Sequence, residues 1–422
     1  MNESGLAVQA VTQYRLAAEF AADIFANADA WEYLRRAIGL IESVGIGEHR
    51  EISFEDFAMI LEKAGHMLAL DGKYQQALPY FERALAQPFT QPGLWRSQVY
   101  RKISDAWITQ YLHDRSHMAL DQAEQALGIE PPNGTLVEQQ EWLQIQLDRI
   151  QIDYWRNSPD RMDSLIRKIE QLVASIGRVD QQNTLLSLRY QARMRHERYR
   201  TSIETVQLVR QRLEQAEKMD DSYNLAIAQF QYGFALLWYG DLPSAQDWME
   251  RANESLDRMG ARLWQLRCLT YLSVVSRKLH EPDRLRKELP PLLELARMVN
   301  DYAYLGIGLA NESWLAWQDG DILRAEQLCK EATAVWANVS GWVFHALANW
   351  VLFAIALDQE DFSKLEATAR VLMDPNPAFQ PVEEPMSGLL SQALAACESE
   401  NRTVAFELFR QALESARVAG EL

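Results

Sequence analysis

The sequence has 422 residues, of which 48% are hydrophobic and 24% are charged, a composition typical of a folded chain with a large core. Its 19 glycines and 14 prolines are few for a chain rich in β-turns, so helices are favoured. The net charge of −17 opposes binding to phosphate backbones and to anionic lipids, which argues against nucleic acid or a membrane as a direct partner.

Residues 1–134 are expected to form an N-terminal set of helix pairs. The stretch "NADAWEYLRRAIGLIE" predicts a degenerate first unit, because Ala30, Leu34 and Ala37 are spaced to share one helix face. The next stretch, "AGHMLALDGKYQQALPYFERAL", has small or apolar residues at regular helical positions: Gly65, Gly72, Tyr74, Ala77, Phe81 and Ala84. "HMALDQAEQALGIEPPN" continues the pattern with Ala119, Ala123, Ala126 and a closing Pro131.

Residues 135–422 are expected to repeat with a period of forty. Steps of forty from Gly240 reach 160, 200, 280, 320, 360 and 400, and each position lies in a polar or turn-forming stretch between two helical patterns. The ninth residue after each of these seven hinges is apolar: Ile169, Val209, Met249, Leu289, Cys329, Ala369 and Phe409. The twelfth is apolar except once: Leu172, Arg212, Ala252, Leu292, Ala332, Leu372 and Ala412. Three repeats also have alanine at the fifth position, Ala245, Ala325 and Ala405, where two helices can approach closely.

The hinge residues have a local physical role. Gly72, Gly240 and Gly320 can adopt the left-handed conformation that ends a first helix. Asp241 and Asp321 can then cap the second helix by accepting a backbone N–H. Isolated helix pairs cannot bury their own apolar faces, so they stack. The sequence therefore predicts an all-α solenoid of about ten helix pairs, continuous across residues 1–134 and 135–422; its right-handed sense is implied by a resemblance of the Gly65 and Gly72 pattern to known helical repeats.

The pattern around Gly65 and Gly72 closely resembles the tetratricopeptide repeat (TPR), and Gly233 and Gly240 repeat the same seven-residue interval. The stretches "NESWLAWQDGDILRAEQLCKEATAVW" and "LLSQALAACESENRTVAFELFRQALESARVAGEL" resemble something narrower. They are similar to the C-terminal repeats of bacterial signal-transduction ATPases with numerous domains (STAND proteins), including MalT-like regulators and AAA-ATPases joined to nucleotide cyclases. In that family the repeats form the sensor arm that follows a nucleotide-binding domain.

The chain departs from that family in lacking the phosphate loop. No G-x-x-x-x-G-K-[ST] motif occurs, and Gly72-Lys73 is followed by Tyr74 inside a repeat hinge. No G-x-S-x-G or H-E-x-x-H motif occurs either. We therefore expect neither catalysis nor a resident cofactor, and an ATPase module would act in cis or in trans.

The predicted location is the cytoplasm. Cys268, Cys329 and Cys397 are odd in number and widely spaced, which suits a reducing compartment, and "MNESGLAVQAVTQ" is not a signal peptide. The best candidate membrane span, residues 341–357, is short and contains His345 and Asn349, so we expect a buried helix.

The candidate binding site is a set of aromatic residues on the first helices. In the TPR arrangement these helices line the concave surface, and the positions six and ten before each hinge point inward. The expected lining residues are Tyr154, Tyr190, Phe230, Phe234, Trp314 and Trp350, with Trp238 and Trp317 at neighbouring positions. Such rings could clamp a peptide, stack on a sugar or hold an apolar ligand. The alternative is that they fill the contacts between successive first helices, and this packing interpretation is slightly favoured.

Two further groups of residues are candidates, one for anion binding and one for metal binding. The stretch "RYQARMRHERYR" includes Arg189 and Arg193, which could contact an anion through their guanidinium groups; a charged helix neutralised by nearby acids is the favoured alternative. His113 and His117 are four residues apart, but they straddle the hinge predicted at Asp114 and no further ligands are evident, so no metal site is predicted.

The function favoured by these observations is a non-catalytic sensor or scaffold. Its concave face would bind a protein partner, a peptide or a small inducer such as a sugar, and would thereby regulate a signalling ATPase or a transcriptional regulator. The sugar follows only from the resemblance to MalT-like regulators, whose repeats sense a small carbohydrate. The alternative is a free-standing adaptor or chaperone-type protein that binds peptides.

Overall fold

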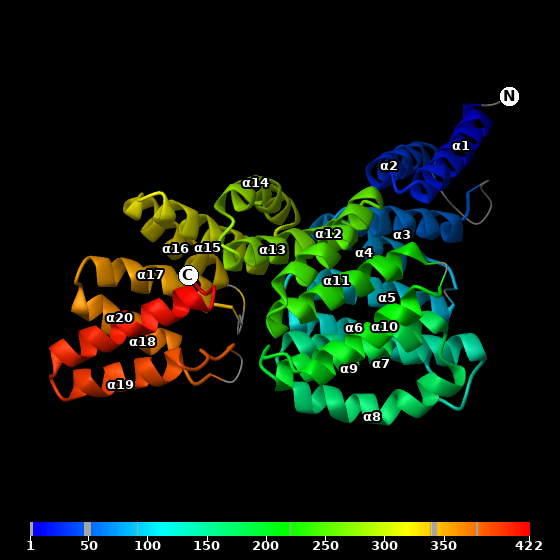
Figure 1. Cartoon of the computed structure of the whole chain (residues 1–422). Coiled ribbons are helices and arrows are strands. Elements are labelled where there is room, and N and C mark those ends of the chain that lie inside the picture. The colour runs from blue at the N-terminus through cyan, green and yellow to red at the C-terminus, as the bar shows by residue number, and fades with distance from the viewer. Residues whose placement is uncertain are drawn as a thin grey trace. The chain divides into compact units, whose positions relative to one another are not determined.

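The computed structural model of the chain describes residues 3–45, 52–90, 92–219, 221–337, 339, 344–376 and 379–422. Every regular element in this part of the chain is an α-helix, and there are twenty of them (Figure 1). They form two compact units, one comprising Met1–Ala192 with Glu254–Leu263 and the other Arg193–Asn253 with Trp264–Leu422. The prediction of an all-α helical-repeat fold is confirmed.

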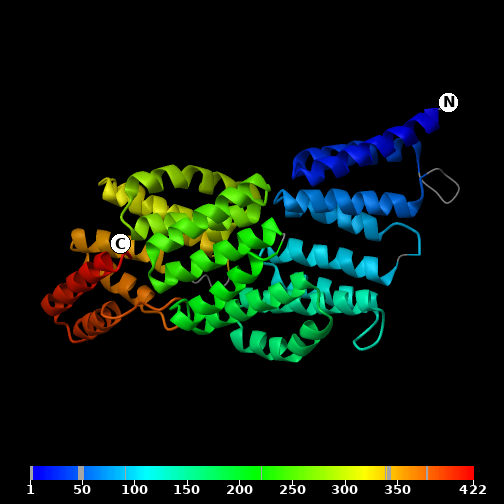
Figure 2. The same ribbon diagram turned by 45° about the vertical axis from the view of Figure 1, so that its right-hand side comes forward.

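Unit 1 consists mainly of four consecutive helix pairs and most of a further helix, stacked in chain order (Figure 2). Their bounds are α1 (Glu3–Asp23), α2 (Asn27–Val44), α3 (Phe54–Leu70), α4 (Tyr74–Leu85), α5 (Gly93–Ile108), α6 (His113–Leu127), α7 (Leu136–Trp155), α8 (Pro159–Ile176) and α9 (Val179–His196). The two helices of each pair contact each other, and α3, α5 and α7 also contact in series. This is the packing expected when first helices line one side of a repeat array.

Unit 2 contains the end of α9 and the remaining pairs. Their bounds are α10 (Ile203–Ala216), α11 (Ser222–Tyr239), α12 (Leu242–Arg258), α13 (Arg262–Lys278), α14 (Pro282–Val299), α15 (Tyr302–Gln318), α16 (Ile322–Trp336), α17 (Ala346–Asp358), α18 (Phe362–Leu372), α19 (Met386–Glu398) and α20 (Arg402–Val418). The end of α12 and the start of α13 belong to unit 1. First helices are again neighbours, as α15 and α17 show.

Each pair turns at a residue in the left-handed conformation, and we call the first such residue of each turn the hinge residue. These are Phe25, Gly72, Tyr111, Asn157, Arg198, Gly240, His280, Gly320, Glu360 and Glu400. At each of these hinges the following residue donates its N–H to the carbonyl five residues earlier, as from Asp241 to Leu236 at 3.0 Å. This Schellman-type bond satisfies a carbonyl that the end of the helix would otherwise leave unpaired.

The forty-residue period predicted from the sequence locates these hinges closely. Five of the seven predicted positions, 240, 280, 320, 360 and 400, are hinge residues in the structure. The hinges expected at 160 and 200 lie at Asn157 and Arg198, three and two residues earlier. The hinge expected at Asp114 was wrong, because the left-handed residue is Tyr111 and both histidines considered there lie in α6.

The residues predicted to join the two helices of each pair form the core. All seven residues at the ninth position after the predicted hinges are buried, and Ala245, Ala325 and Ala405 have no exposed surface. Small residues at the facing sites have a steric cause. A Cβ atom on Gly65 would lie 2.8 Å from the ring of Phe81, and one on Gly233 would lie 2.8 Å from the side chain of Met249. The two helices could not approach so closely with larger residues there.

Polar side chains fix where several helices begin. Ser53 with Asp56, and Thr135 with Glu138, form capping boxes at the starts of α3 and α7. The caps predicted at the hinges are confirmed, since Asp241 accepts from Ser244 N–H at 3.3 Å and Asp321 accepts from Arg324 N–H at 3.1 Å. Each cap satisfies a backbone donor that the first turn leaves free.

The predicted buried helix is also present. Residues 346–358 form α17, in which Trp350, Val351 and Phe353 are buried. The start of the candidate span, residues 341–343, lies outside the described residues. Among the described helices, none combines the length and the apolar character needed to cross a bilayer.

Candidate functional site

The predicted aromatic residues divide into covered and partly accessible rings. Trp314 and Trp350 are each only 1% exposed, so they lie in the packed interior of unit 2, where Trp350 meets Phe353 edge-on. Tyr190, Phe230 and Phe234 are also buried, whereas Tyr154, Trp238 and Trp317 are half-buried. For Trp314 and Trp350 this burial favours the packing interpretation. The ligand-binding role of the whole set stays a prediction.

The structure brings three of these rings together. Phe230, Phe234 and Trp238 follow one another along α11, with ring centroids 5.9 Å and 6.1 Å apart. They belong to a larger group that we call the aromatic cluster, defined by Tyr199, Phe230, Phe234, Trp238, Tyr271 and Phe344. The five remaining predicted rings are not members of this group. Tyr190 belongs to unit 1, and the other four lie beside different partners: Trp314 beside His280, Trp317 beside Arg417, Trp350 beside Phe353 and Tyr154 beside Trp155.

Phe344 occupies the middle of the aromatic cluster. Its ring stacks flat on Trp238, with centroids 4.7 Å apart and planes inclined by 5°. It also meets Tyr199 at 5.0 Å and Tyr271 at 6.0 Å. Phe344 precedes α17 and lies outside the regular helices, while its neighbours belong to α11, α13 and a hinge. The cluster therefore accepts a flat aromatic side chain between rings from successive repeats.

Tyr199 reaches the cluster because its hinge is distorted. Arg198 is the hinge residue, with φ of 49°, and Tyr199 follows it with φ of 60°. Other hinges between paired helices in the described chain have a single residue of this kind. A left-handed tyrosine costs on the order of 1 kcal/mol, so surrounding contacts must stabilise it. Those contacts are the rings of Phe234, Trp238 and Phe344.

Trp238 also has an unused polar group. Its indole Nε1 is buried and donates no hydrogen bond within the described structure. The ammonium group of Lys278 lies 5.9 Å from its ring centroid, a distance suited to a cation–π contact. Buried donors normally find an acceptor, so Trp238 combines a stacking face, used by Phe344, with a donor that has no acceptor in the described structure.

The arginine-rich stretch has its partners within the protein. Arg189 pairs with Glu170, and Arg193 pairs with Glu197 at 3.2 Å. Further along, Arg198 donates to the carbonyl of Phe379 at 2.7 Å. These contacts favour the charged-helix interpretation, and anion binding by Arg189 and Arg193 stays a prediction.

The same stretch anchors the segment between α18 and α19. Arg198 also donates to the carbonyl of Asn376 at 3.0 Å, and Arg200 donates to that of Val382 at 2.8 Å. The ring of Phe379 lies 4.2 Å from that of His345, next to Phe344. Contacts across more than 170 residues therefore fix the backbone beside the aromatic cluster.

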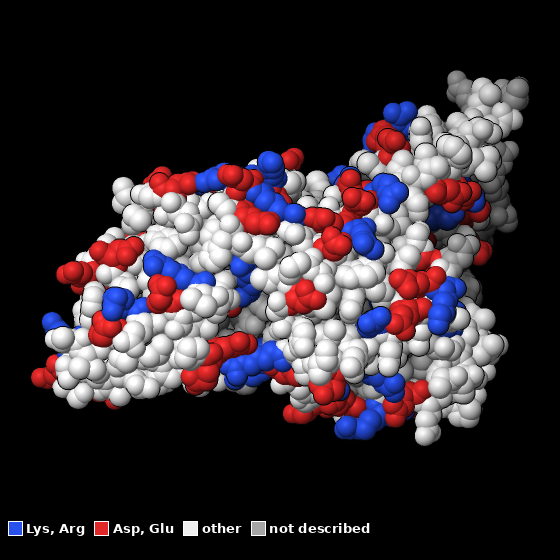
Figure 3. Space-filling view, in the orientation of Figure 1, with Lys and Arg blue, Asp and Glu red and all other residues white. Residues whose placement is uncertain are grey.

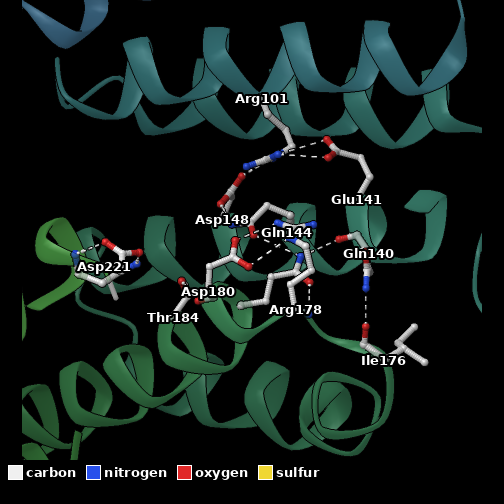
Figure 4. A network of polar contacts seen from close by, with 12 residues as sticks. Arg101, Gln140, Glu141, Gln144, Asp148, Ile176, Arg178, Asp180, Thr184 and Asp221 are labelled. Carbon is white, nitrogen blue, oxygen red and sulfur yellow. Dashed lines mark hydrogen bonds and ion pairs between the residues drawn. The ribbon is translucent and has the colours of Figure 1, made fainter. Parts of the chain in front are cut away.

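Unit 1 has a polar counterpart on its first helices, which we call the polar row: Arg101, Gln140, Glu141, Gln144, Asp148 and Gln181. Figure 4 shows the first five of these residues. Arg101 on α5 reaches two carboxylates of α7, binding Asp148 at 2.7 Å and Glu141 at 3.2 Å. Gln181 on α9 donates to the Gln140 carbonyl at 2.7 Å and to Gln144 at 3.3 Å. The row links three successive first helices through hydrogen bonds and two ion pairs.

Asp105 lies one helical turn after Arg101 and increases the negative charge beside the row. The residue is exposed at the surface, but the surrounding protein removes part of the water from its carboxyl group. This desolvation, together with the Asp148 carboxylate, raises the pKa of Asp105 to about 7. One arginine therefore faces two or three carboxylates, depending on pH.

The charged side chains of the described surface bear on phosphate and metal binding. On the face shown in Figure 3, lysine and arginine lie next to aspartate and glutamate. Within the described ranges, no group of three or more His, Cys, Asp or Glu is arranged to hold a metal ion. The chemistry available on the first helices is thus stacking, hydrogen bonding and charge pairing.

The sequence did not predict every residue of the aromatic cluster or of the polar row. Tyr271 lies nine residues before its hinge, and Tyr199 lies next to its own hinge residue. Neither is at a position six or ten residues before a hinge, so neither was predicted. Arg101 and Asp105 do lie ten and six before Tyr111, but the misplaced hinge hid them. Phe344 had no repeat signal at all.

Comparisons with known proteins bear on the fold. No family model matches the chain, and no curated protein matches it. A solved structure of a Rap protein complexed with Competence and Sporulation Factor is similar over 99% of both chains, with 11% identity and a TM-score of 0.53. A STAND protein with a tetratricopeptide repeat sensor from Pyrococcus horikoshii covers 89% of this chain and 55% of its own, with 13% identity and a TM-score of 0.44. The likeness to the Rap protein shows a TPR-like helical-repeat fold.

Proposed function

We propose that this chain is a non-catalytic repeat scaffold and sensor that binds a segment of a partner protein at the aromatic cluster of unit 2. One observation carries the proposal: the ring of Phe344 stacks on Trp238 at 4.7 Å, between Tyr199 and Tyr271. Phe344 comes from outside the first helices, and its position supports the choice of an aromatic group as the ligand. The preferred ligand presents a flat aromatic group, and a protein segment supplies one.

Polar groups at the cluster would orient such a segment. The free indole N–H of Trp238 can donate to a backbone carbonyl, which every peptide offers beside its aromatic side chain. Lys278 lies over the same ring, but its ammonium group is paired with Glu421 and does not supply a charge to the ligand. Stacking together with a directed hydrogen bond is the combination that makes aromatic residues strong anchors at interfaces.

We further propose that binding regulates a signalling ATPase or a transcriptional regulator that acts with the chain in the cytoplasm. The motifs of the sequence support a regulatory role, since repeats resembling those of STAND sensors occur without a phosphate loop. Cys268 and Cys329 are buried free thiols, which suits a reducing compartment. If the purified chain hydrolysed ATP, the non-catalytic part of this proposal would be wrong.

The test is selection of a random peptide library displayed on phage against the purified chain. The expected result is enrichment of peptides containing Trp, Tyr or Phe, and loss of their binding when Trp238→Ala is introduced. Trp248→Ala is the matched control, because Trp248 is a half-buried ring of the same unit that packs on Tyr232 outside the cluster.

Circular dichroism and melting temperature establish that both variants remain folded. Equal binding by Trp238→Ala and the parent chain would contradict the proposed site. Selected peptides without aromatic residues would contradict the proposed ligand chemistry.

A further inference from the structure

A short segment far along the chain is held on α13 like a bound peptide. Gly420 has φ of 70°, and a Cβ atom there would lie 2.8 Å from the carbonyl oxygen of Lys278. The carboxylate of Glu421 forms an ion pair with the Lys278 ammonium group. Leu422 is only 1% exposed. Backbone, charge and apolar side chain are therefore each matched by the surface that holds them.

The principal group on that surface is a fully buried arginine. Arg277 has no exposed surface, and burial lowers its pKa to about 10, so it remains charged at neutral pH. Its Nη2 donates to the backbone carbonyl of Glu421 at 2.8 Å, and its Nη1 donates to the Asn311 amide oxygen at 3.3 Å. Its Nε is buried and makes no hydrogen bond in the described structure.

This arrangement leaves Arg277 dependent on the segment. A buried cation is costly unless strong acceptors surround it. In the described structure Arg277 has two hydrogen-bond acceptors. One is the neutral amide of Asn311, and the other is the backbone carbonyl of Glu421, more than 140 residues away in the sequence. Asn311 is fixed in turn by a hydrogen bond to Ser273 Oγ at 2.9 Å. The donors are thus positioned by α13 and α15 themselves, and the segment supplies the acceptor and the negative charge.

We propose that Arg277, Lys278 and Asn311 form a recognition site for a peptide segment of the type glycine, acidic residue, leucine, and that Gly420–Leu422 occupies it. A partner with a segment of this chemistry competes for the same site. Glycine is required because its backbone lies against Lys278 in a left-handed conformation. The acidic residue pairs with Lys278, and leucine fills the buried position. This site borders the aromatic cluster, because the Lys278 ammonium group also lies over the Trp238 ring, but it takes a different ligand and does not depend on the function proposed for that cluster.

Attachment to the chain gives the internal segment a large advantage. A tethered ligand experiences an effective concentration in the millimolar range, which an external peptide must overcome. The site is therefore tested most sensitively in a variant that ends at Ala419. The probe is a fluorescein-labelled peptide, ESARVAGEL, which reproduces residues 414–422.

The expected result by fluorescence anisotropy is binding to the shortened chain about 100-fold tighter than to the intact chain, as removal of a tethered competitor predicts. Adding Lys278→Ala should abolish this binding. The matched control is Lys364→Ala, which removes another lysine paired with an acid in unit 2. A second peptide with valine in place of its glycine should fail to bind, because the Cβ would meet the Lys278 carbonyl.

The proposal is overturned if the shortened chain, with its far-UV circular dichroism unchanged, does not bind the peptide. It is equally overturned if the valine peptide binds as well as the parent. Should the shortened chain unfold, Glu421→Lys in the intact chain provides the same test, because two like charges then oppose docking. That variant should bind the external peptide more tightly than the parent chain does, and equal binding by the two would again reject the site.

Discussion

At the same positions of the repeat, the first helices carry polar side chains in unit 1 and aromatic side chains in unit 2. Arg101 and Asp105 in unit 1 lie ten and six residues before their hinge, and Phe230 and Phe234 in unit 2 lie ten and six before theirs. Both polar residues remain accessible to solvent, and Arg101 joins a network of hydrogen bonds. The aromatic pair is buried against other rings. Repeat geometry therefore specifies where a side chain lies and leaves its chemistry free to vary.

The difference follows from which residues hold a helix pair together. Contacts within a pair involve small residues on the second helix, such as Ala245 and Ala325, which are fully buried. The positions ten and six before the hinge contact neighbouring repeats instead, as Arg101 contacts α7. These positions can thus diverge between units without disturbing the pair, and binding surfaces can arise there.

The largest expected effect separates core rings from site rings within unit 2. Trp314→Ala and Trp350→Ala should each lower the free energy of unfolding by about 3–5 kcal/mol, because each removes a fully buried ring. Trp317→Ala is the matched comparison and should cost clearly less, since Trp317 is half-buried. Urea unfolding measures all three. A loss below about 1 kcal/mol at Trp314 would place it on a binding surface and not in the core.

The next effect tests the polar row. Arg101→Met should lower the free energy of unfolding by about 2 kcal/mol, because it leaves the nearly buried carboxylate of Glu141 and that of Asp148 without their cation. Adding Glu141→Gln and Asp148→Asn should restore most of the loss, which urea unfolding of the triple variant measures. If the triple variant is no more stable than the single one, the row does not act through charge pairing.

A smaller effect depends on pH and is specific to unit 1. The pKa of Asp105 rises from 3.8 to about 7 on folding, so between these values the folded chain holds a proton that the unfolded chain has lost. Stability from this residue is present at low pH and is lost as pH rises from about 4 to 7. Asp105→Asn should therefore flatten the decrease in the urea midpoint between pH 5 and pH 8. An unchanged pH profile would show that Asp105 titrates at its ordinary pKa.

The smallest effect calibrates the others. Arg210 and Glu214 form an ion pair on α10 at 3.2 Å, with both side chains more than half exposed. Arg210→Ala should leave the urea midpoint unchanged within error, because water and salt screen such pairs. A marked loss there would mean that charge removal alone destabilises the chain, and the result for Arg101 would lose its meaning.

Local chemistry made the fold predictable from the sequence. Gly240 and Gly320 mark hinges because glycine favours the left-handed conformation, and the aspartate after each caps the next helix. The forty-residue period then located hinges at His280, Glu360 and Glu400, which have no glycine. Position in the period thus compensated for the missing local signal.

The candidate sites were less predictable because they depend on contacts between distant residues. Phe344 reaches Trp238 from a segment outside the helices, and Arg277 meets Glu421 across more than 140 residues. Neither contact follows from helical spacing or from the repeat period. The register of the predicted rings was also sensitive to the hinge position, so Tyr154 lies three residues before Asn157 and not six before its hinge.

The shared hinge bond has a consequence for how such a chain can change length. From Gly240 to Glu400 the hinges recur every forty residues, and each ends its helix with the same backbone hydrogen bond. If one forty-residue block between two hinges is removed, the two hinges are joined, and both have the same backbone hydrogen bond. Duplication or deletion of one block would therefore add or remove a first helix, with its own pair of surface positions, without requiring a new turn. A binding surface in this protein can grow by whole modules as well as by point substitution.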